Sequence, residues 1–302
     1  MMTEEFIFML SIGLVIFGQL LSAASVLIDK YVVTQTTVTR PSVYVFYVGI
    51  TSGVALLLLP FGVVHMPDVT TIWLSLDIGV VFIISIRFLY RALKHANATD
   101  VIAWLTAVSA LTTFIFGDLF IGEELPRGFP VAIALFIAGV LFVGHFRFYA
   151  LSFIQATIAG ILFGLSAVLL KLLFSHTDFI DGFFWSRMGN MTAALSLLVF
   201  PSMRSHIFHI TRSTTSRVGA LIVANRVLNG VAFLSILYAI RIGSVSIVNA
   251  LSSLQFVFIF LLIFLLAKYV PRLYAHEFRS GHILHKIVAM CFISLGFLAL
   301  FL

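Results

Sequence analysis

The stretch Leu151-Ser-Phe-Ile-Gln-Ala-Thr-Ile-Ala-Gly-Ile-Leu-Phe-Gly-Leu-Ser-Ala-Val-Leu-Leu-Lys-Leu-Leu-Phe174 decides the fold class, because apolar residues dominate it from end to end. A helix of about 20 apolar residues, rising about 1.5 Å per residue, crosses a hydrocarbon core of roughly 30 Å. The run is continuous rather than alternating, and it is about twice as long as a strand of a membrane barrel. The stretch therefore predicts a membrane-spanning helix.

Nine further runs of the same kind follow when the sequence is divided at proline, glycine and clustered charges. Together they predict spans at 6–28, 43–64, 71–92, 100–121, 128–147, 151–174, 182–200, 218–239, 245–267 and 284–302. The connections are short, and the longest are 201–217 and 268–283. The expected fold is an all-α polytopic membrane protein with ten transmembrane helices and no soluble domain.

The composition leads to the same class. The 302 residues are 61% apolar and 10% charged, whereas a soluble domain is about 45–50% apolar and about 25% charged. So few charged side chains cannot cover a soluble globule, which excludes a soluble enzyme. The net charge of +6 comes from basic residues that stand singly at the ends of apolar runs. Such residues anchor helices in a bilayer, so we expect a lipid environment and no nucleic-acid partner.

Motifs for catalysis or cofactor binding are missing from the sequence. It contains no P-loop, nucleophile elbow, HExxH or dinucleotide fingerprint, so we expect neither catalysis nor ATP-driven pumping. The single cysteine, Cys291, lies in an apolar run and predicts no disulfide or thiolate metal site. The histidine pairs His206/His209 and His282/His285 are interpreted as interfacial residues. No cofactor and no metal are expected.

The two halves of the chain resemble each other. Segments Ser25-Val-Leu-Ile-Asp-Lys30, Phe46-Tyr-Val-Gly49 and Tyr90-Arg-Ala-Leu-Lys-His-Ala96 match, in order, Ser166-Ala-Val-Leu-Leu-Lys171, Ser186-Arg-Met-Gly189 and Tyr238-Ala-Ile-Arg-Ile-Gly243. Residues 1–148 and 149–302 are therefore expected to be two five-helix repeats. Because five is odd, the second repeat enters the membrane inverted. Inverted repeats are typical of transporters, with the substrate site between the halves near the midplane.

This organisation resembles the drug/metabolite transporter superfamily in its ten-span EamA-type form. The resemblance rests on Ala92-Leu-Lys-His-Ala-Asn-Ala-Thr-Asp100, on the small and polar span that follows, and on Gly122-Glu-Glu-Leu125. It implies two EamA-type five-helix repeats and a cavity lined by spans one to four and six to nine. The second half departs from the pattern at Lys268-Tyr-Val-Pro-Arg-Leu-Tyr-Ala-His-Glu277, which is interpreted as a local insertion within 268–283.

The basic residues also predict an orientation. Most of the 18 lysines and arginines fall on the side that holds connections 1–2, 3–4, 5–6, 7–8 and 9–10. The positive-inside rule places that side in the cytoplasm and both termini outside. The family resemblance implies cytoplasmic termini instead, so the two arguments disagree. A multi-pass protein of the cell (inner) membrane is expected in either case.

Arg226 is the strongest single candidate for a binding residue. It lies within the eighth predicted span, in Ala224-Asn-Arg-Val-Leu-Asn229. A charge at this depth costs several kcal/mol unless it faces protein or water. One interpretation is that Arg226 binds a carboxylate or phosphate, with Asn225 or Asn229 sharing the hydrogen bonds. The alternative is a structural arginine that ties helices together or extends towards the headgroups.

Other charged residues rank lower. Arg87 lies near the end of the third span, and Arg187 begins the seventh beside Trp185. Both are substrate-binding candidates, although a Trp–Arg pair is more often an interface anchor. Lys30 and Lys171 end corresponding helices of the two halves. They are interpreted either as gate residues or as flanking anchors.

Acidic residues are informative by their absence, because none lies in the middle of the first span. An anionic or zwitterionic solute is therefore favoured over a cation. Asp100 opens the fourth span, either as a proton-coupling residue or as a helix cap.

Uncharged polar residues inside the spans complete the candidate set. Small polar side chains in membrane helices mostly serve packing and interhelical hydrogen bonds, each worth about 0.6 kcal/mol on average. Bulkier ones are better candidates for lining a cavity, and Trp104 is a candidate aromatic wall. The cavity candidates are Gln19, Trp104, Asn249 and Gln255.

Taken together, the sequence predicts a secondary transporter that works by alternating access. The expected cargo is a small amphipathic metabolite, anionic or zwitterionic, such as an amino acid, and the expected direction is export. Alternatives are a flippase or carrier of a lipid-linked head group, and a non-transporting membrane interaction protein. The protein is expected to be a monomer or a homodimer.

Overall fold

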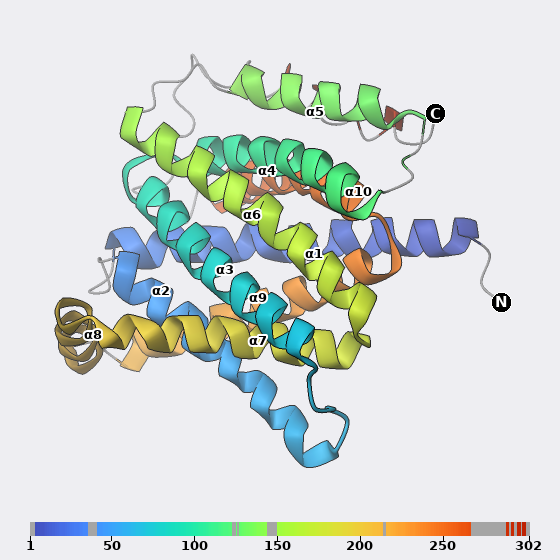
Figure 1. Cartoon of the computed structure of the whole chain (residues 1–302). Helices are drawn as coiled ribbons and strands as arrows, with labels where there is room; N and C mark the ends of the chain where they lie inside the picture. Colours follow the sequence, from blue (N-terminus) through green and yellow to red (C-terminus); the bar gives the residue numbers. More distant parts are fainter. Residues whose placement is uncertain are drawn as a thin grey trace.

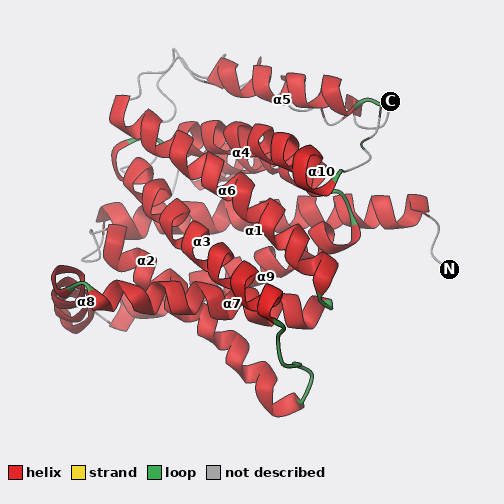
Figure 2. Ribbon diagram, viewed as in Figure 1, coloured by secondary structure: helices red, strands yellow, loops and turns green. Residues whose placement is uncertain are grey.

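The computed structural model describes residues 4–35, 41–122, 125, 127–143, 150–213 and 216–266, together with 288–289, 291–292, 295–296 and 298–299. In these ranges every regular element is a helix (Figure 2). Seven of the helical segments are long and apolar enough to cross a membrane. They are Glu5–Thr34, Val43–Phe61, Val69–His95, Ala98–Ile121, Leu151–His176, Ser216–Ile242 and Val245–Leu265. The chain is therefore an all-α membrane protein.

The helices follow the predicted spans closely over the first nine runs. Their bounds are α1 Glu4–Gln35, α2 Pro41–Ile50, η1 Thr51–Phe61, α3 Val69–His95, α4 Ala98–Ile121, α5 Phe129–Val143, α6 Ala150–His176, α7 Phe179–Ser196, η2 Leu197–Val199, α8 Pro201–Ser213, α9 Ser216–Ile242, α10 Val245–Ala250, η3 Leu251–Ser253 and α11 Leu254–Leu266 (Figure 1). The eighth predicted span is thus α9, and the ninth is α10, η3 and α11 in sequence. The predicted insertion at 268–283 and most of the tenth span lie outside the described residues.

Two segments differ from the sequence prediction. Helix α1 continues to Gln35 instead of ending at 28, because the polar residues Asp29 and Lys30 find partners inside the protein and do not end the helix. The segment 201–217, expected to be a connection, contains the 13-residue helix α8. Ile207 of α8 is buried while Arg204 is exposed, so α8 packs one face against the protein at the end of the bundle (Figure 1).

Helix α3 begins with a side-chain cap. The Thr71 N–H donates to an Asp68 carboxylate oxygen at 2.8 Å, which satisfies one of the unpaired donors at the helix start. Hydrogen bonding to Thr71 lowers the pKa of Asp68 below its usual range. The preceding loop is tied to α7, because Asp181 accepts hydrogen bonds from the backbone N–H of His65 at 2.8 Å and contacts its Nδ1 at 2.9 Å.

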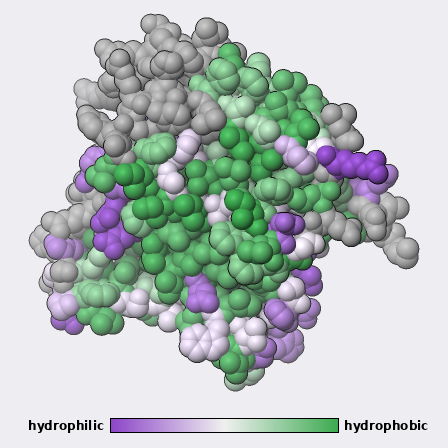
Figure 3. Space-filling model, turned by 45° about the horizontal axis from the view of Figure 1, so that its top comes forward, coloured by the Kyte–Doolittle hydropathy of each residue, from purple (hydrophilic) through white to green (hydrophobic). Residues whose placement is uncertain are grey.

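Two long helix pairs form the centre of the bundle. Helix α1 packs along α9, and α3 packs along α6, while α4 covers another side of α6 and α7 crosses α3 (Figure 1). Large apolar side chains remain on the outside, including Phe17, Val80, Val227 and Phe264. On the face shown in the space-filling view, hydrophobic residues cover most of the described surface, and most hydrophilic ones lie towards its edges (Figure 3). This distribution suits a protein surrounded by lipid.

Glycine residues allow α3 and α7 to approach each other closely. A Cβ added to Gly79 would lie 2.1 Å from the carbonyl oxygen of Gly189, and one added to Gly189 would lie 1.8 Å from the carbonyl oxygen of Ser75. Both contacts are with backbone, which cannot rotate away as a side chain can. The two helices therefore touch backbone to backbone, as small residues permit in membrane proteins.

The Gly79→Ala substitution is expected to separate α3 from α7 and to destabilise the protein by about 1–3 kcal/mol, because overpacking forces a backbone shift. Thermal unfolding of the purified protein in detergent measures the effect. Gly230→Ala in α9 is the matched control, since its added Cβ meets nothing within 4 Å. Equal melting temperatures for Gly79→Ala and the control would contradict the close crossing.

Candidate functional site

A buried ion pair joins α1 to α9. Arg226 donates through Nη2 to a carboxylate oxygen of Asp29, and the side chains are only 9% and 5% exposed respectively. Sequence reasoning expected Arg226 to meet an anion, but the carboxylate it meets belongs to this chain. The geometry therefore agrees with the helix-tying alternative for Arg226.

Three further side chains complete the ion-pair network, which we define as Asp29, Arg226, Tyr44, Tyr90 and Asn225. Tyr44 of α2 and Tyr90 of α3 donate their hydroxyls to Asp29 at 2.5 Å and 3.0 Å. Asn225 donates to Asp29 at 2.6 Å, and Arg226 also donates to the Tyr44 oxygen at 3.0 Å. One carboxylate thus accepts bonds from three other helices.

The ion-pair network closes one end of the bundle. It gathers the later part of α1, the beginning of α2, the later part of α3 and the earlier part of α9. An ion removed from water loses several kcal/mol of solvation, and a buried pair is tolerable only with good geometry and additional hydrogen bonds. Here the carboxylate accepts from four side chains, so hydrogen bonds join the four helices.

Arg187 lies in a different setting, near the middle of α7. Its guanidinium carbon lies 4.1 Å from the ring centroid of Phe233, 5.7 Å from that of Phe82 and 5.9 Å from that of Phe183. Phe82 in turn meets Phe163 of α6 edge to face, at 6.4 Å between ring centroids. We call Arg187 and these four phenylalanines the arginine–phenylalanine cluster. It joins α3, α6, α7 and α9 at about mid-length.

No carboxylate, carbonyl or amide oxygen accepts a hydrogen bond from Arg187 within the described chain, and its Nε is buried without a partner. Asn190, one turn later on the same side of α7, is fully buried, and neither its side-chain oxygen nor its nitrogen has a partner. A cation–π contact stabilises by about 0.5–2 kcal/mol. The loss of solvation of a buried ion is several kcal/mol. Arg187 is half-buried, so the rings offset only part of the cost of withdrawing its charge from water.

The two predicted gate lysines make matched contacts at the helix ends. Lys30 donates to the carbonyl of Ala96, at the end of α3, at 2.9 Å. Lys171 donates to the carbonyls of Ile240 and Gly243, at the end of α9, at 2.8 Å and 2.6 Å. Each lysine supplies a positive charge to unpaired carbonyls at a helix C-terminus. This arrangement agrees with the anchoring interpretation of both residues.

Most predicted uncharged site residues bond to neighbouring helices. Gln19 donates to the Ser252 hydroxyl at 2.9 Å. Asn249 donates to the Ser109 hydroxyl at 2.9 Å and also to the Thr113 hydroxyl. Together these side chains form a row of hydrogen bonds between α1, α4 and the ninth span. Trp104 lies outside the row and donates to Thr157 of α6 at 2.8 Å.

The remaining candidates lie apart from one another. Asn229 is half-buried on α9, and no residue of the described chain is hydrogen-bonded to it. Arg87 lies towards the end of α3 and is partly exposed, with its Nε unpartnered. Gln255 is buried in α11. Asp100 is in the first turn of α4, where Asn97 donates to it at 3.3 Å, as suits an acidic residue near a helix N-terminus.

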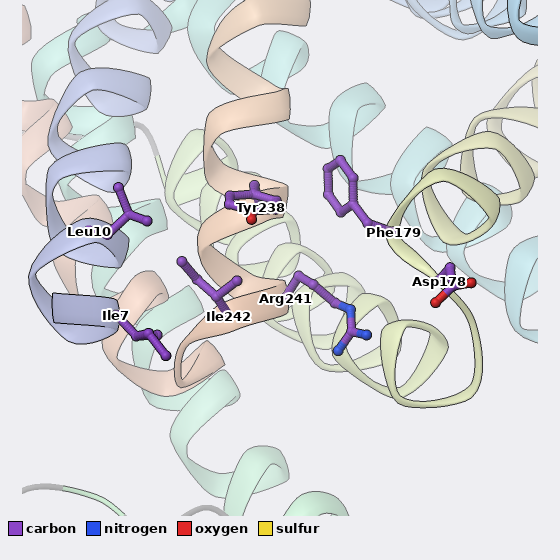
Figure 4. A pocket seen from close by; sticks show the side chains of 7 residues that line it. All are labelled: Ile7, Leu10, Asp178, Phe179, Tyr238, Arg241 and Ile242. Carbon is purple, nitrogen blue, oxygen red and sulfur yellow. The ribbon is translucent and has the colours of Figure 1, made fainter. Parts of the chain in front are cut away.

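A hollow opens at the end of the bundle opposite the ion-pair network. It has a volume of about 450 Å³ and lies between the start of α1, the α6–α7 connection and the end of α9 (Figure 4). Tyr238 and Arg241 of α9 extend into it from one side, and Asp178 and Phe179 border the other (Figure 4). Ile7, Leu10 and Ile242 complete its wall.

Sequence reasoning missed Asp29, Tyr44 and Tyr90. It placed Asp29 at the end of the first span, where an acidic residue faces water. One signal was available in the sequence. Asp29 and Lys30 interrupt a run that continues with apolar or β-branched residues as far as Val33, so they lie within the run and not at its end. The partner of Asp29 lies 197 residues away, so no local pattern identifies it.

Comparison with known proteins supports the fold. No family model matches the chain, and no curated protein matches it. Twenty-eight chains of solved structures match. One of these, described only as "Crystal structure of protein", has a TM-score of 0.63 and 17% sequence identity. The match covers 94% of this chain and 98% of the other, so the two share a fold over nearly their whole lengths.

Removing one charge of the Asp29–Arg226 pair is expected to destabilise the protein by about 3–5 kcal/mol, because the other charge stays buried without its partner. The variants are Asp29→Asn, Arg226→Gln and the double substitution, compared by unfolding in detergent. Asp118→Asn, at an exposed position of α4, is the control. The double variant should lose less than the sum of the single losses. Additive losses would show that the two residues do not act as a pair.

Proposed function

We propose that the protein is a secondary transporter of a small amphipathic solute, working by alternating access. In this proposal the chain has ten spans in two inverted five-helix halves, 1–148 and 149–302, as in the EamA-type drug/metabolite transporters that its sequence resembles. The solute binds between the halves, and each end of the bundle opens in turn.

The packing of the helices supports two related halves. The sequence match pairs the first span with the sixth and the third with the eighth, that is, α1 with α6 and α3 with α9. If each helix is replaced by its counterpart in the other half, the α1–α9 pair becomes the α6–α3 pair. Both pairs form the centre of the bundle. The lysine contacts follow the same exchange, because Lys30 of α1 caps α3 and Lys171 of α6 caps α9.

The contrast between the two ends supports alternating access. The ion-pair network holds four helices together at one end, while at the other a hollow lies between α1, α9 and the α6–α7 connection. A transporter open to one side needs a closure of this kind at the opposite side. The closed end holds the connections rich in basic residues, so the positive-inside rule makes it the cytoplasmic end.

The cargo is inferred from the arginine–phenylalanine cluster. A half-buried cation without an acidic partner, at mid-length of helices from both proposed halves, is the observation that carries the proposal. Ionisable groups at this depth mark substrate pathways in membrane proteins. Arg187 therefore takes the role of central anion-binding residue, while Arg226 serves closure.

Transport is tested with the purified protein in proteoliposomes and a panel of labelled metabolites. A disulfide between cysteines introduced as Ser25→Cys and Asn225→Cys, in a Cys291→Ser background, is expected to hold α1 against α9, since the Asn225 amide lies 3.3 Å from the Ser25 carbonyl. Oxidation should reduce flux at least tenfold, and reductant should restore it, because alternating access requires this end to open. Flux that oxidation leaves unchanged would contradict the mechanism.

Orientation has its own test. With ten spans both termini lie on one side of the membrane, and the charge distribution places them outside. A reporter enzyme active only outside the cytoplasm, fused in turn to each terminus, should be active in both fusions. Activity in one fusion only would exclude an even number of spans, and inactivity in both would place the termini in the cytoplasm, as the family resemblance implies.

A further inference from the structure

We infer that the arginine–phenylalanine cluster binds an organic carboxylate that has an apolar body and no amino group. The inference rests on the proposed transport function and narrows its cargo. It is built on Arg187 and its surroundings, where the described chain supplies aromatic rings and an unpartnered amide but no acidic group.

The guanidinium geometry favours a carboxylate. The guanidinium carbon of Arg187 lies over the Phe233 ring at 4.1 Å from its centroid, a cation–π distance that a guanidinium stacked on an aromatic face also adopts. A ring on the face leaves the N–H groups at the edge for other partners. A carboxylate accepts two parallel hydrogen bonds from such an edge. Asn190, three residues on in the same helix, is buried and its amide has no partner in the described chain, so it is a candidate for a further donor.

The surroundings of the cation favour an apolar body. Phe82, Phe163 and Phe183 come from three different helices and meet around Arg187 or one another. An aromatic or branched apolar group next to the carboxylate would contact these rings, edge to face or stacked. A strongly hydrated anion such as sulfate would lose its water here and gain no apolar contact.

The positions of the acidic residues disfavour an ammonium group on the ligand. An ammonium group buried beside the carboxylate would need an anionic partner. Asp29 already accepts from Arg226, Tyr44, Tyr90 and Asn225. The other aspartates of the described chain lie in connections, near helix ends or on exposed faces. They are Asp68, Asp77, Asp100, Asp118, Asp178 and Asp181. An amino acid is therefore a poorer fit than the corresponding acid without an amino group.

Three probes with the same ring separate these classes: phenylacetate, phenylalanine and phenethylamine. Each is added to the full-length protein in detergent, and the rise in melting temperature is followed with concentration, because a ligand that binds the folded state raises it. Phenylacetate should raise it, and phenylalanine and phenethylamine should not. Equal rises with phenylalanine, or no rise with phenylacetate up to about 10 mM, would overturn the inference.

Arg187→Met is the decisive variant, with Arg204→Gln on α8 as the control. Replacing a half-buried charge that has no acidic partner by an apolar side chain of similar length should leave the ligand-free melting temperature unchanged or higher. The rise with phenylacetate should disappear in Arg187→Met and persist in Arg204→Gln. A lower ligand-free melting temperature would assign Arg187 a structural role, and a retained rise would place the ligand elsewhere; either overturns the inference.

A second variant covers failure of Arg187→Met to fold. Arg187→Lys keeps the charge but loses the planar pair of donors, so phenylacetate affinity should fall about tenfold; equal affinity would overturn the inference. Transport is judged separately in proteoliposomes. Phenylacetate binding without flux would support the carboxylate site and contradict the proposed transport function. Flux of other solutes without phenylacetate binding would support the proposed transport function and contradict the carboxylate site.

Discussion

The cost of keeping a charge in a low-dielectric bundle governs this structure. Asp29 and Arg226 are both buried, and neither would be tolerated alone. Their mutual contact and the donors from Tyr44, Tyr90 and Asn225 fix the positions of α1, α2, α3 and α9 at one end of the molecule. A purely apolar contact would stabilise the same helices with less directional constraint, because apolar side chains tolerate sliding and ion pairs do not.

The same physical rule distinguishes the two ends of the molecule. The matching segments of the two halves share a terminal lysine, and Lys30 and Lys171 make equivalent contacts with carbonyls. They differ one residue earlier, where the first half has Asp29 and the second has Leu170. The second half therefore has no counterpart of Asp29 at the equivalent position. At the other end Tyr238, the counterpart of Tyr90, borders the hollow instead.

Two arginines that look alike in the sequence take opposite roles for the same reason. Arg226 appeared the better binding residue because it lies deep in a span, and Arg187 appeared to be an interface anchor beside Trp185. The structure gives Arg226 an internal carboxylate and surrounds Arg187 with phenylalanine. Depth within a span indicates that a charge needs a partner. It does not indicate whether the protein supplies that partner or leaves the position to a ligand.

The sequence by itself determined that the chain is an all-α membrane protein and where its first nine helical runs lie. A long apolar run is a local feature of the sequence, and its length and composition are what the hydrocarbon core of a bilayer requires. It also identified which side chains are unusual in lipid, including Arg226, Arg187, Lys30 and Lys171. Only the tertiary structure decided their partners. Asp29 and Arg226 are 197 residues apart, and the three rings near Arg187 come from three helices, α3, α7 and α9. Contacts of this kind depend on helix packing, which close approaches such as that of Gly79 and Gly189 fix and no local periodicity encodes.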